Sequence, residues 1–157
     1  MAKILTQELV NKAVELLRPA VEKILEDKDC IWGPAWVELV FSGHNCVFAF
    51  TKFGNKTEWN DEWGEEKNFY ALATAKHDLS RREGMSSSQI VLLKPWLLER
   101  GDWLYSGSSC SDDLVCGVSG AKGEIDEMIA DLLITTVKGL CVLRRKELQD
   151  NGVKQIC

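Results

Sequence analysis

The run LVCGVSG (residues 114–120), followed at once by AKGEIDEMIADLL (residues 121–133), decides the fold class. The first run is short, apolar and closed by a glycine, which is typical of a buried β-strand. The second run has apolar residues three and four positions apart, the spacing of an amphipathic helix. Acidic residues in its first turn complement the helix dipole. The sequence therefore predicts a strand that leads directly into a long helix over residues 123–148.

A β-hairpin is predicted further upstream. Residues 36–41 and 46–50 are two apolar runs joined by the turn sequence SGHN, a pattern typical of paired antiparallel strands. We also expect a strand over residues 102–105 and a turn over residues 106–109. Consecutive strands joined by tight turns form an antiparallel sheet, so the expected fold class is α+β, with helices covering the faces of the sheet.

Two more helices are expected. The first covers residues 6–29, where Thr6 can cap the N-terminus and Pro19 should kink the segment or split it in two. The second covers residues 60–83, with acidic residues crowding its start and two arginines at its end. We expect a further short helix before Pro95. The whole chain, residues 1–157, then makes one domain with a frayed tail from residue 150.

Composition and charge exclude several classes of protein. The chain has 157 residues, of which 45% are hydrophobic and 27% charged, and its net charge is -5. This charge argues against nucleic-acid and membrane partners, and no apolar run reaches the ~20 residues of a membrane span. The start of the chain has no signal-peptide pattern, so we expect a cytoplasmic protein.

The six cysteines lack the spacings of zinc, thioredoxin or covalent haem sites. Cys46, Cys116 and Cys141 lie in apolar patterns, and a free cysteine in such a place behaves as a small buried hydrophobe.

Several motifs together resemble the GlcG/HbpS-like family, which also forms the C-terminal part of PduO-type proteins. The similarity covers residues 36–145. It is carried by CVFAF (46–50), ALATAK (71–76), GMSS (84–87), GVSGA (117–121) and GEIDE (123–127). The sequence departs from the family pattern in a tryptophan-rich insertion over residues 55–64, in His77 after the helix lysine, and in Thr51 and Lys52.

This resemblance implies a profilin-like fold, with an antiparallel sheet of about five strands between helices. It also implies homo-oligomers. Several members of the family bind haem, whereas others have no established reaction, so the resemblance argues fold more strongly than activity.

Candidate chemical residues lie on the middle helix and at the start of the last one. Lys76 can pair with a carboxylate or anchor a propionate, and Asp126 can stabilise its helix N-terminus or act in proton transfer. His77 is the first candidate for a haem-iron ligand, and His44, in the hairpin turn, is the second. Lys76, His77 and Asp126 are also the catalytic candidates if the protein is an enzyme.

A pocket for a flat ligand is the second expectation. Six tryptophans are present, and Trp59 and Trp63 are neighbours if their segment is helical. These two residues, Tyr70 and Lys76 could line an aromatic pocket. The backbone N–H groups where Ser119 and Gly120 enter the last helix could hold an anion. The same tryptophans could equally serve core or oligomer packing.

Three functions remain open at the level of sequence. The first is a homo-oligomeric binding protein for a small flat apolar ligand, with haem, bound reversibly, as the first candidate. The second is an isomerase- or lyase-type enzyme that moves protons on an apolar metabolite in the same inter-subunit pocket. The third is an adaptor or scaffold whose exposed tryptophans meet a partner.

Overall fold

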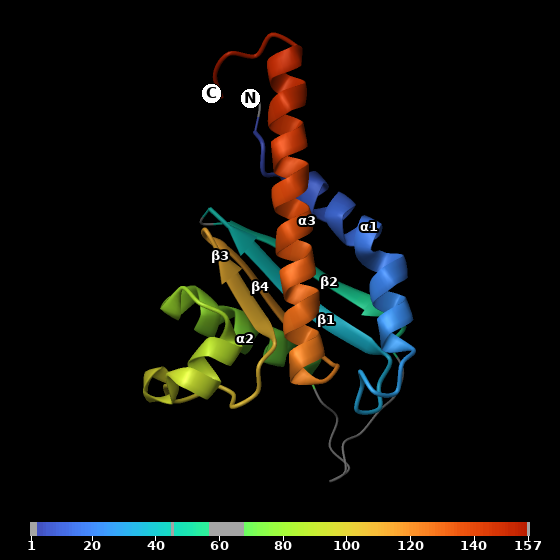
Figure 1. Cartoon of the computed structure of the whole chain (residues 1–157), viewed down its shortest axis with the longest axis vertical. Coiled ribbons are helices and arrows are strands. Elements are labelled where there is room, and N and C mark those ends of the chain that lie inside the picture. The colour runs from blue at the N-terminus through green and yellow to red at the C-terminus, as the bar shows by residue number, and fades with distance from the viewer. Residues whose placement is uncertain (1–2, 45, 57–67, 157) are drawn as a thin grey trace.

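A computed structural model describes residues 3–44, 46–56 and 68–156, without the side chains of residues 48–50. The helices and strands follow one another in the order shown in Figure 1. They are α1 (Gln7–Leu25), β1 (Trp36–Gly43), β2 (Cys46–Gly54), α2 (Phe69–Glu83), the π-helical turn η1 (Gln89–Leu93), the 3-10 turn η2 (Pro95–Leu97), β3 (Ser108–Ser111), β4 (Leu114–Ser119) and α3 (Gly123–Asp150).

The sheet is antiparallel throughout, with the strand order β2-β1-β4-β3. Val40 in the middle of β1 lies opposite Phe50 of β2 and Gly117 of β4. The α+β class and the expected antiparallel sheet flanked by helices are confirmed. The described residues form four strands, whereas the resemblance implies about five.

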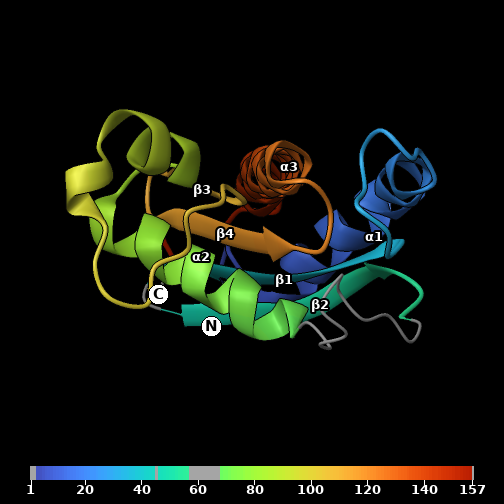
Figure 2. The ribbon, with the colours of Figure 1, turned by 90° about the horizontal axis from the view of Figure 1, so that it is seen from below.

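The helices cover both faces of this sheet, as Figure 2 shows: α1 and α3 lie on one face and α2 on the other. The main hydrophobic core lies under α1 and α3, where Phe41, Phe53 and Leu133 are fully buried. The C-terminal half of α3 projects beyond the sheet, and both chain termini lie beside it (Figure 1).

α1 is continuous through Pro19, so of the two expected outcomes, a kink or a split, the split is wrong. The ring of Pro19 lies on the exposed side of the helix, and Val21 and Leu25 beyond it are buried in the core. Core packing after the proline therefore holds the helix together despite the lost backbone hydrogen bond. Thr6 caps the helix as expected, because its hydroxyl accepts from the Leu9 N–H at 3.1 Å.

The third strand differs most from the sequence prediction. Residues 102–105 are not a strand, and Ser108–Ser111, expected in part as a turn, is β3. Hydroxyl groups explain the error, because β3 is buried through polar contacts and carries no apolar alternation. Ser108 Oγ bonds Ser80 Oγ at 2.7 Å, and Ser109 Oγ donates to Asp131.

α2 begins at Phe69, with Asn68 as its cap, rather than at residue 60. The acidic residues expected at its start lie in residues 57–67, outside the described part of the chain. At the other end, Gly84 closes the helix in the left-handed conformation, with φ of 68°. Glycine adopts that conformation without strain, which makes it the usual residue at this position.

The short helix expected before Pro95 is confirmed, in the form of the π-helical turn η1. Of the cysteines expected to be buried, Cys116 is buried, Cys141 is half-buried and Cys46 is exposed. Cys46 is exposed because it lies in the last pair of the hairpin, opposite Gly43. Within the described ranges, no helix has the length and apolarity to cross a membrane.

Candidate functional site: the polar layer between α2 and the sheet

The face of α2 that packs on the sheet carries polar residues, and Gly117 of β4 lets it approach closely. A Cβ at position 117 would lie 2.7 Å from the backbone nitrogen and from Cβ of His77, and closer still to the Ala73 carbonyl oxygen. This approach brings Lys76, His77 and Ser80 into the interior, where each is less than a tenth exposed. We call the contacts of these three residues the polar layer.

Lys76 reaches from α2 to the start of α3. Its Nζ donates to the Val118 carbonyl oxygen at 3.3 Å, to Asp126 Oδ2 at 3.3 Å and, more weakly, to Ser119 Oγ at 3.5 Å. The other oxygen of Asp126 accepts the N–H of Ala121 at 2.9 Å. The pair therefore joins the two helices that cover opposite faces of the sheet, past the end of β4.

Burial dominates the electrostatics of this pair. Loss of water around the carboxyl raises the pKa of Asp126 to about 7, although the nearby Lys76 ammonium and the Ala121 N–H act in the opposite direction. Asp126 therefore titrates near neutral pH. A buried group of this kind is a candidate for proton transfer, but structural ion pairs show the same perturbation.

His77 belongs to a different set of contacts. Its Nε2 lies 2.6 Å from Ser42 Oγ on β1, and its Nδ1 lies 2.9 Å from Oδ1 of Asp78. The ring is only 2% exposed, and both of its nitrogens have partners. No hydrogen bond joins His77 to Lys76 or Asp126 among the described residues, so the three catalytic candidates form two separate groups.

The remaining candidates are spread over the molecule. His44 is exposed in the hairpin turn with φ of 50°, a conformation that histidine tolerates there. Tyr70 is 44% exposed near the start of α2. Ser119 and Gly120 lie at the end of β4, where the Ser119 hydroxyl is a neighbour of Lys76. The predicted aromatic pair Trp59 and Trp63 lies outside the described residues.

A pocket of about 250 Å³ opens at the end of the sheet where α2 stops. We call it the hairpin-end pocket. It is lined by Ser42, Gly43, His44, Arg81, Gly84, Cys110, Asp113 and Val115. The lining contains a hydroxyl, an imidazole, a guanidinium, a thiol and a carboxylate, so this pocket suits a small polar group better than an extended apolar one.

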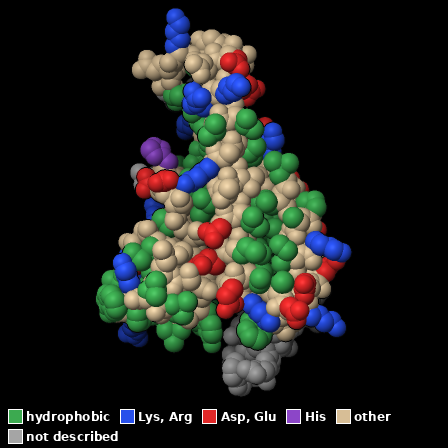
Figure 3. All heavy atoms as spheres, in the orientation of Figure 1, with side chains coloured by type: hydrophobic (Ala, Val, Ile, Leu, Met, Phe, Trp, Pro, Cys, Tyr) green, Lys and Arg blue, Asp and Glu red, His purple; other side chains and the backbone are tan. Residues whose placement is uncertain are grey.

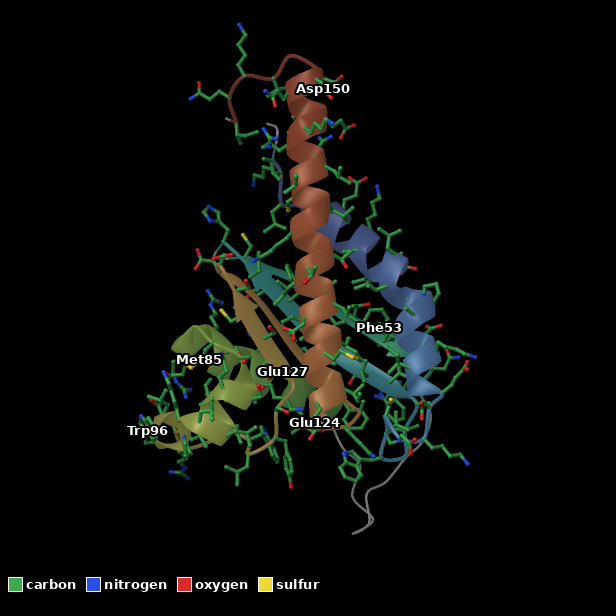
Figure 4. All side chains as sticks on the ribbon, in the orientation of Figure 1. Phe53, Met85, Trp96, Glu124, Glu127 and Asp150 are labelled. Atoms are coloured by element: carbon green, nitrogen blue, oxygen red, sulfur yellow. The ribbon has the colours of Figure 1, made fainter. Side chains whose placement is uncertain are left out.

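Sequence reasoning missed Ser42 and Glu127 as polar anchors. Glu127 of α3 faces the segment that follows α2 (Figure 4), and its carboxylate accepts from the Ser88 N–H at 2.9 Å and the Ser88 hydroxyl at 2.6 Å. Ser87 donates to the same carboxylate and accepts from the N–H groups of Gly107 and Ser108. The run of three serines at positions 86–88 was the available signal for these contacts.

Large apolar side chains gather on the segment between α2 and β3. Figure 3 shows hydrophobic side chains over this segment, and Figure 4 places Trp96 at its outer edge. We call this feature the 92–105 apolar surface. It is formed by Leu92, Leu93, Trp96, Trp103, Leu104 and Tyr105, which are 42–75% exposed.

The segment that carries this surface is fixed to α2. Arg82 donates to Asp102 at 2.7 Å and to the Leu97 carbonyl oxygen at 3.3 Å. The guanidinium lowers the pKa of the Asp102 carboxyl, chiefly through this hydrogen bond. The apolar side chains are thus presented outward on an anchored segment.

The sheet order, the single helix on one face and the long C-terminal helix on the other define an α+β protein with the GlcG/HbpS-like fold. Among solved structures, the crystal structure of HbpS resembles this chain with a TM-score of 0.55 and 17% sequence identity. The likeness covers 86% of this chain and 91% of HbpS. Neither a family model nor a curated protein matches the sequence. The similarity shows the fold, and activity has to be argued from the site.

Proposed function

We propose that this protein is a homo-oligomeric binding protein for a flat apolar ligand, with haem as the first ligand to test. The proposal is supported by the HbpS-like fold and carried by one observation, the 92–105 apolar surface. Large exposed apolar side chains gathered on one segment of a folded chain mark a surface that binds a partner or a ligand. A second copy of the chain would bury this surface and could complete a ligand-binding site that one chain forms only in part.

The described residues set limits on how haem could be held. Bound haem would supply an iron centre that takes a nitrogen ligand. His77 has both nitrogens engaged and is buried, so the exposed His44 is the histidine we propose for this role. Lys76 is buried against Asp126, and Arg81 in the hairpin-end pocket is the cation we propose for a propionate. The pocket is too small to enclose haem in one copy, which again requires a partner subunit.

A haem titration with matched histidine variants tests this proposal. Haem added to the purified protein should give a saturable Soret band, and His44→Ala should shift or remove it. His77→Ala should leave the band in place as long as the variant is folded. Absence of a saturable band would refute haem as the ligand. If only His77→Ala removes the band, then His77 in the polar layer, and not His44, is the iron ligand.

Proton-transfer catalysis is the second candidate function, and the raised pKa of Asp126 is the observation that favours it. Lys76 and Asp126 would act together, since they are in direct contact, whereas His77 would act separately. An adaptor role is the third candidate. It would be favoured if the 92–105 apolar surface stays uncovered in the native assembly. The cytoplasmic location expected from the sequence stays a prediction.

A further inference from the structure

Ser42, His77 and Asp78 form a chain of hydrogen bonds that ligand binding does not use. Ser42 Oγ lies 2.6 Å from His77 Nε2, and His77 Nδ1 lies 2.9 Å from Oδ1 of Asp78. An ionised carboxylate can only accept, so it takes the N–H of Nδ1 and leaves Nε2 to accept the proton of the Ser42 hydroxyl. This connectivity is the one by which a histidine activates a serine nucleophile.

The backbone around Ser42 supports the same interpretation. The pairing of β1 with β2 shifts register between Phe41 and Ser42, because β2 has one extra residue there, and bulges occur often beside active sites. Ser42 lines the hairpin-end pocket, whereas His77 is not among its lining residues and is 2% exposed. Ser42 is itself only 3% exposed, so it lies at the inner wall of a space that can admit a small molecule, while its base is shielded from water.

We propose that Ser42 is the nucleophile of an acyl-transfer site that hydrolyses small carboxylic esters. His77 is the general base, and Asp78 is a positioning residue that holds the histidine tautomer. The pocket volume of about 250 Å³ limits the acyl group to a short one. Arg81 lines the same pocket and can stabilise the negative charge that develops on the carbonyl oxygen.

The reaction balances with water as the only co-reactant. Ser42 Oγ forms a bond to the ester carbonyl carbon as its proton passes to His77 Nε2. The bond to the leaving oxygen then breaks, and that oxygen takes the proton from His77 and departs as the alcohol. Water attacks the acyl-serine, with His77 again accepting and returning the proton, and the carboxylic acid leaves with Ser42 restored.

The test is covalent labelling of haem-free protein with a fluorophosphonate, followed by mass spectrometry of the labelled peptide. The expected result is a single label on Ser42, lost in Ser42→Ala and in His77→Gln. Ser111→Ala is the matched control, because Ser111 is a serine of β3 whose hydroxyl accepts from Lys138 at 2.6 Å and which lies outside both the polar layer and the hairpin-end pocket. It should be labelled at the wild-type rate.

Variants of Asp78 test catalysis in a folded protein, because the Asp78 side chain is 66% exposed and its replacement should leave the fold intact. Asp78→Asn should slow labelling and p-nitrophenyl acetate hydrolysis at least about tenfold, and Asp78→Glu should restore much of the rate, because it returns an acceptor to Nδ1. No label on the folded wild type would overturn the proposal. So would a label that persists in Ser42→Ala, or rates unchanged in Asp78→Asn.

Discussion

Replacing Gly117 by alanine tests how the polar layer is held together. The new methyl group would lie 2.7 Å from the backbone nitrogen and Cβ of His77, well inside the ~3.5–4.0 Å at which carbon atoms attract one another. Because the opposing atoms belong largely to the backbone of α2, the helix has to move away from β4 as a unit. Overpacking of this kind costs about 1–3 kcal/mol, and the upper end applies here because no side chain can rotate out of the way.

The displaced helix would also stretch, without breaking, the Ser42–His77 contact of 2.6 Å, which costs only a small part of the about 1 kcal/mol that a buried hydrogen bond contributes. We therefore expect Gly117→Ala to lower the free energy of unfolding by about 3 kcal/mol. For a chain of this size, that corresponds to a melting temperature lower by roughly 6–12 °C. Thermal unfolding followed by circular dichroism measures this shift.

Gly139 is the matched control, because it lies within α3 and a Cβ there would meet nothing within 4 Å. Gly139→Ala should stabilise the protein by up to ~1 kcal/mol through helix propensity alone. A Gly117→Ala protein that melts within about 2 °C of the wild type would refute the close packing of α2 on β4.

Three further outcomes follow from the described contacts. The raised pKa of Asp126, about 7, means that between pH 4 and pH 7 the folded protein keeps a proton that the unfolded chain releases, so stability should fall as pH rises through this window. In urea titrations at several pH values, Asp126→Asn should reduce the dependence of the free energy of unfolding on pH. An unchanged pH dependence would contradict the raised pKa of Asp126. Glu127→Ala should cost about 1.5–3 kcal/mol in the same urea titrations, because Ser87 and Ser88 lose a charged acceptor. Thr6→Ala should lower the free energy of unfolding by about 1 kcal/mol, because it removes the cap of α1. If Glu127→Ala or Thr6→Ala lowers it by less than ~0.3 kcal/mol, the contact that the variant removes does not form in solution.

Elements with a clear apolar period were predictable from the sequence. The hairpin, β4 and α3 each have such a pattern, and the bounds of β1, β4 and α3 agree with prediction within two residues, whereas β2 continues four residues past its predicted end, to Gly54. β3 was missed because its burial depends on serine hydroxyl groups that find partners only after α2 and α3 have packed. Conversely, the apolar residues 103–105, predicted as part of a strand, lie on the surface, where they are 42–70% exposed.

The site was only partly predictable for a related reason. Lys76, His77 and Asp126 were identified by type and position, and the structure places all three in the interior. Their partners depend on strand register and on how far α2 lies along the sheet, which a single sequence does not encode locally. Ser42 was assigned to a turn, whereas it lies in β1, and the packing of α2 on the sheet brings it to His77.

The native mass in solution tests the central claim most directly. If the 92–105 apolar surface joins copies of this chain, light scattering at micromolar concentration should give a multiple of the mass of one chain. Leu93→Glu combined with Trp96→Glu, which changes two exposed side chains of that surface, should reduce this mass to that of a single folded chain. A wild-type protein with the mass of one chain at all concentrations would contradict the account.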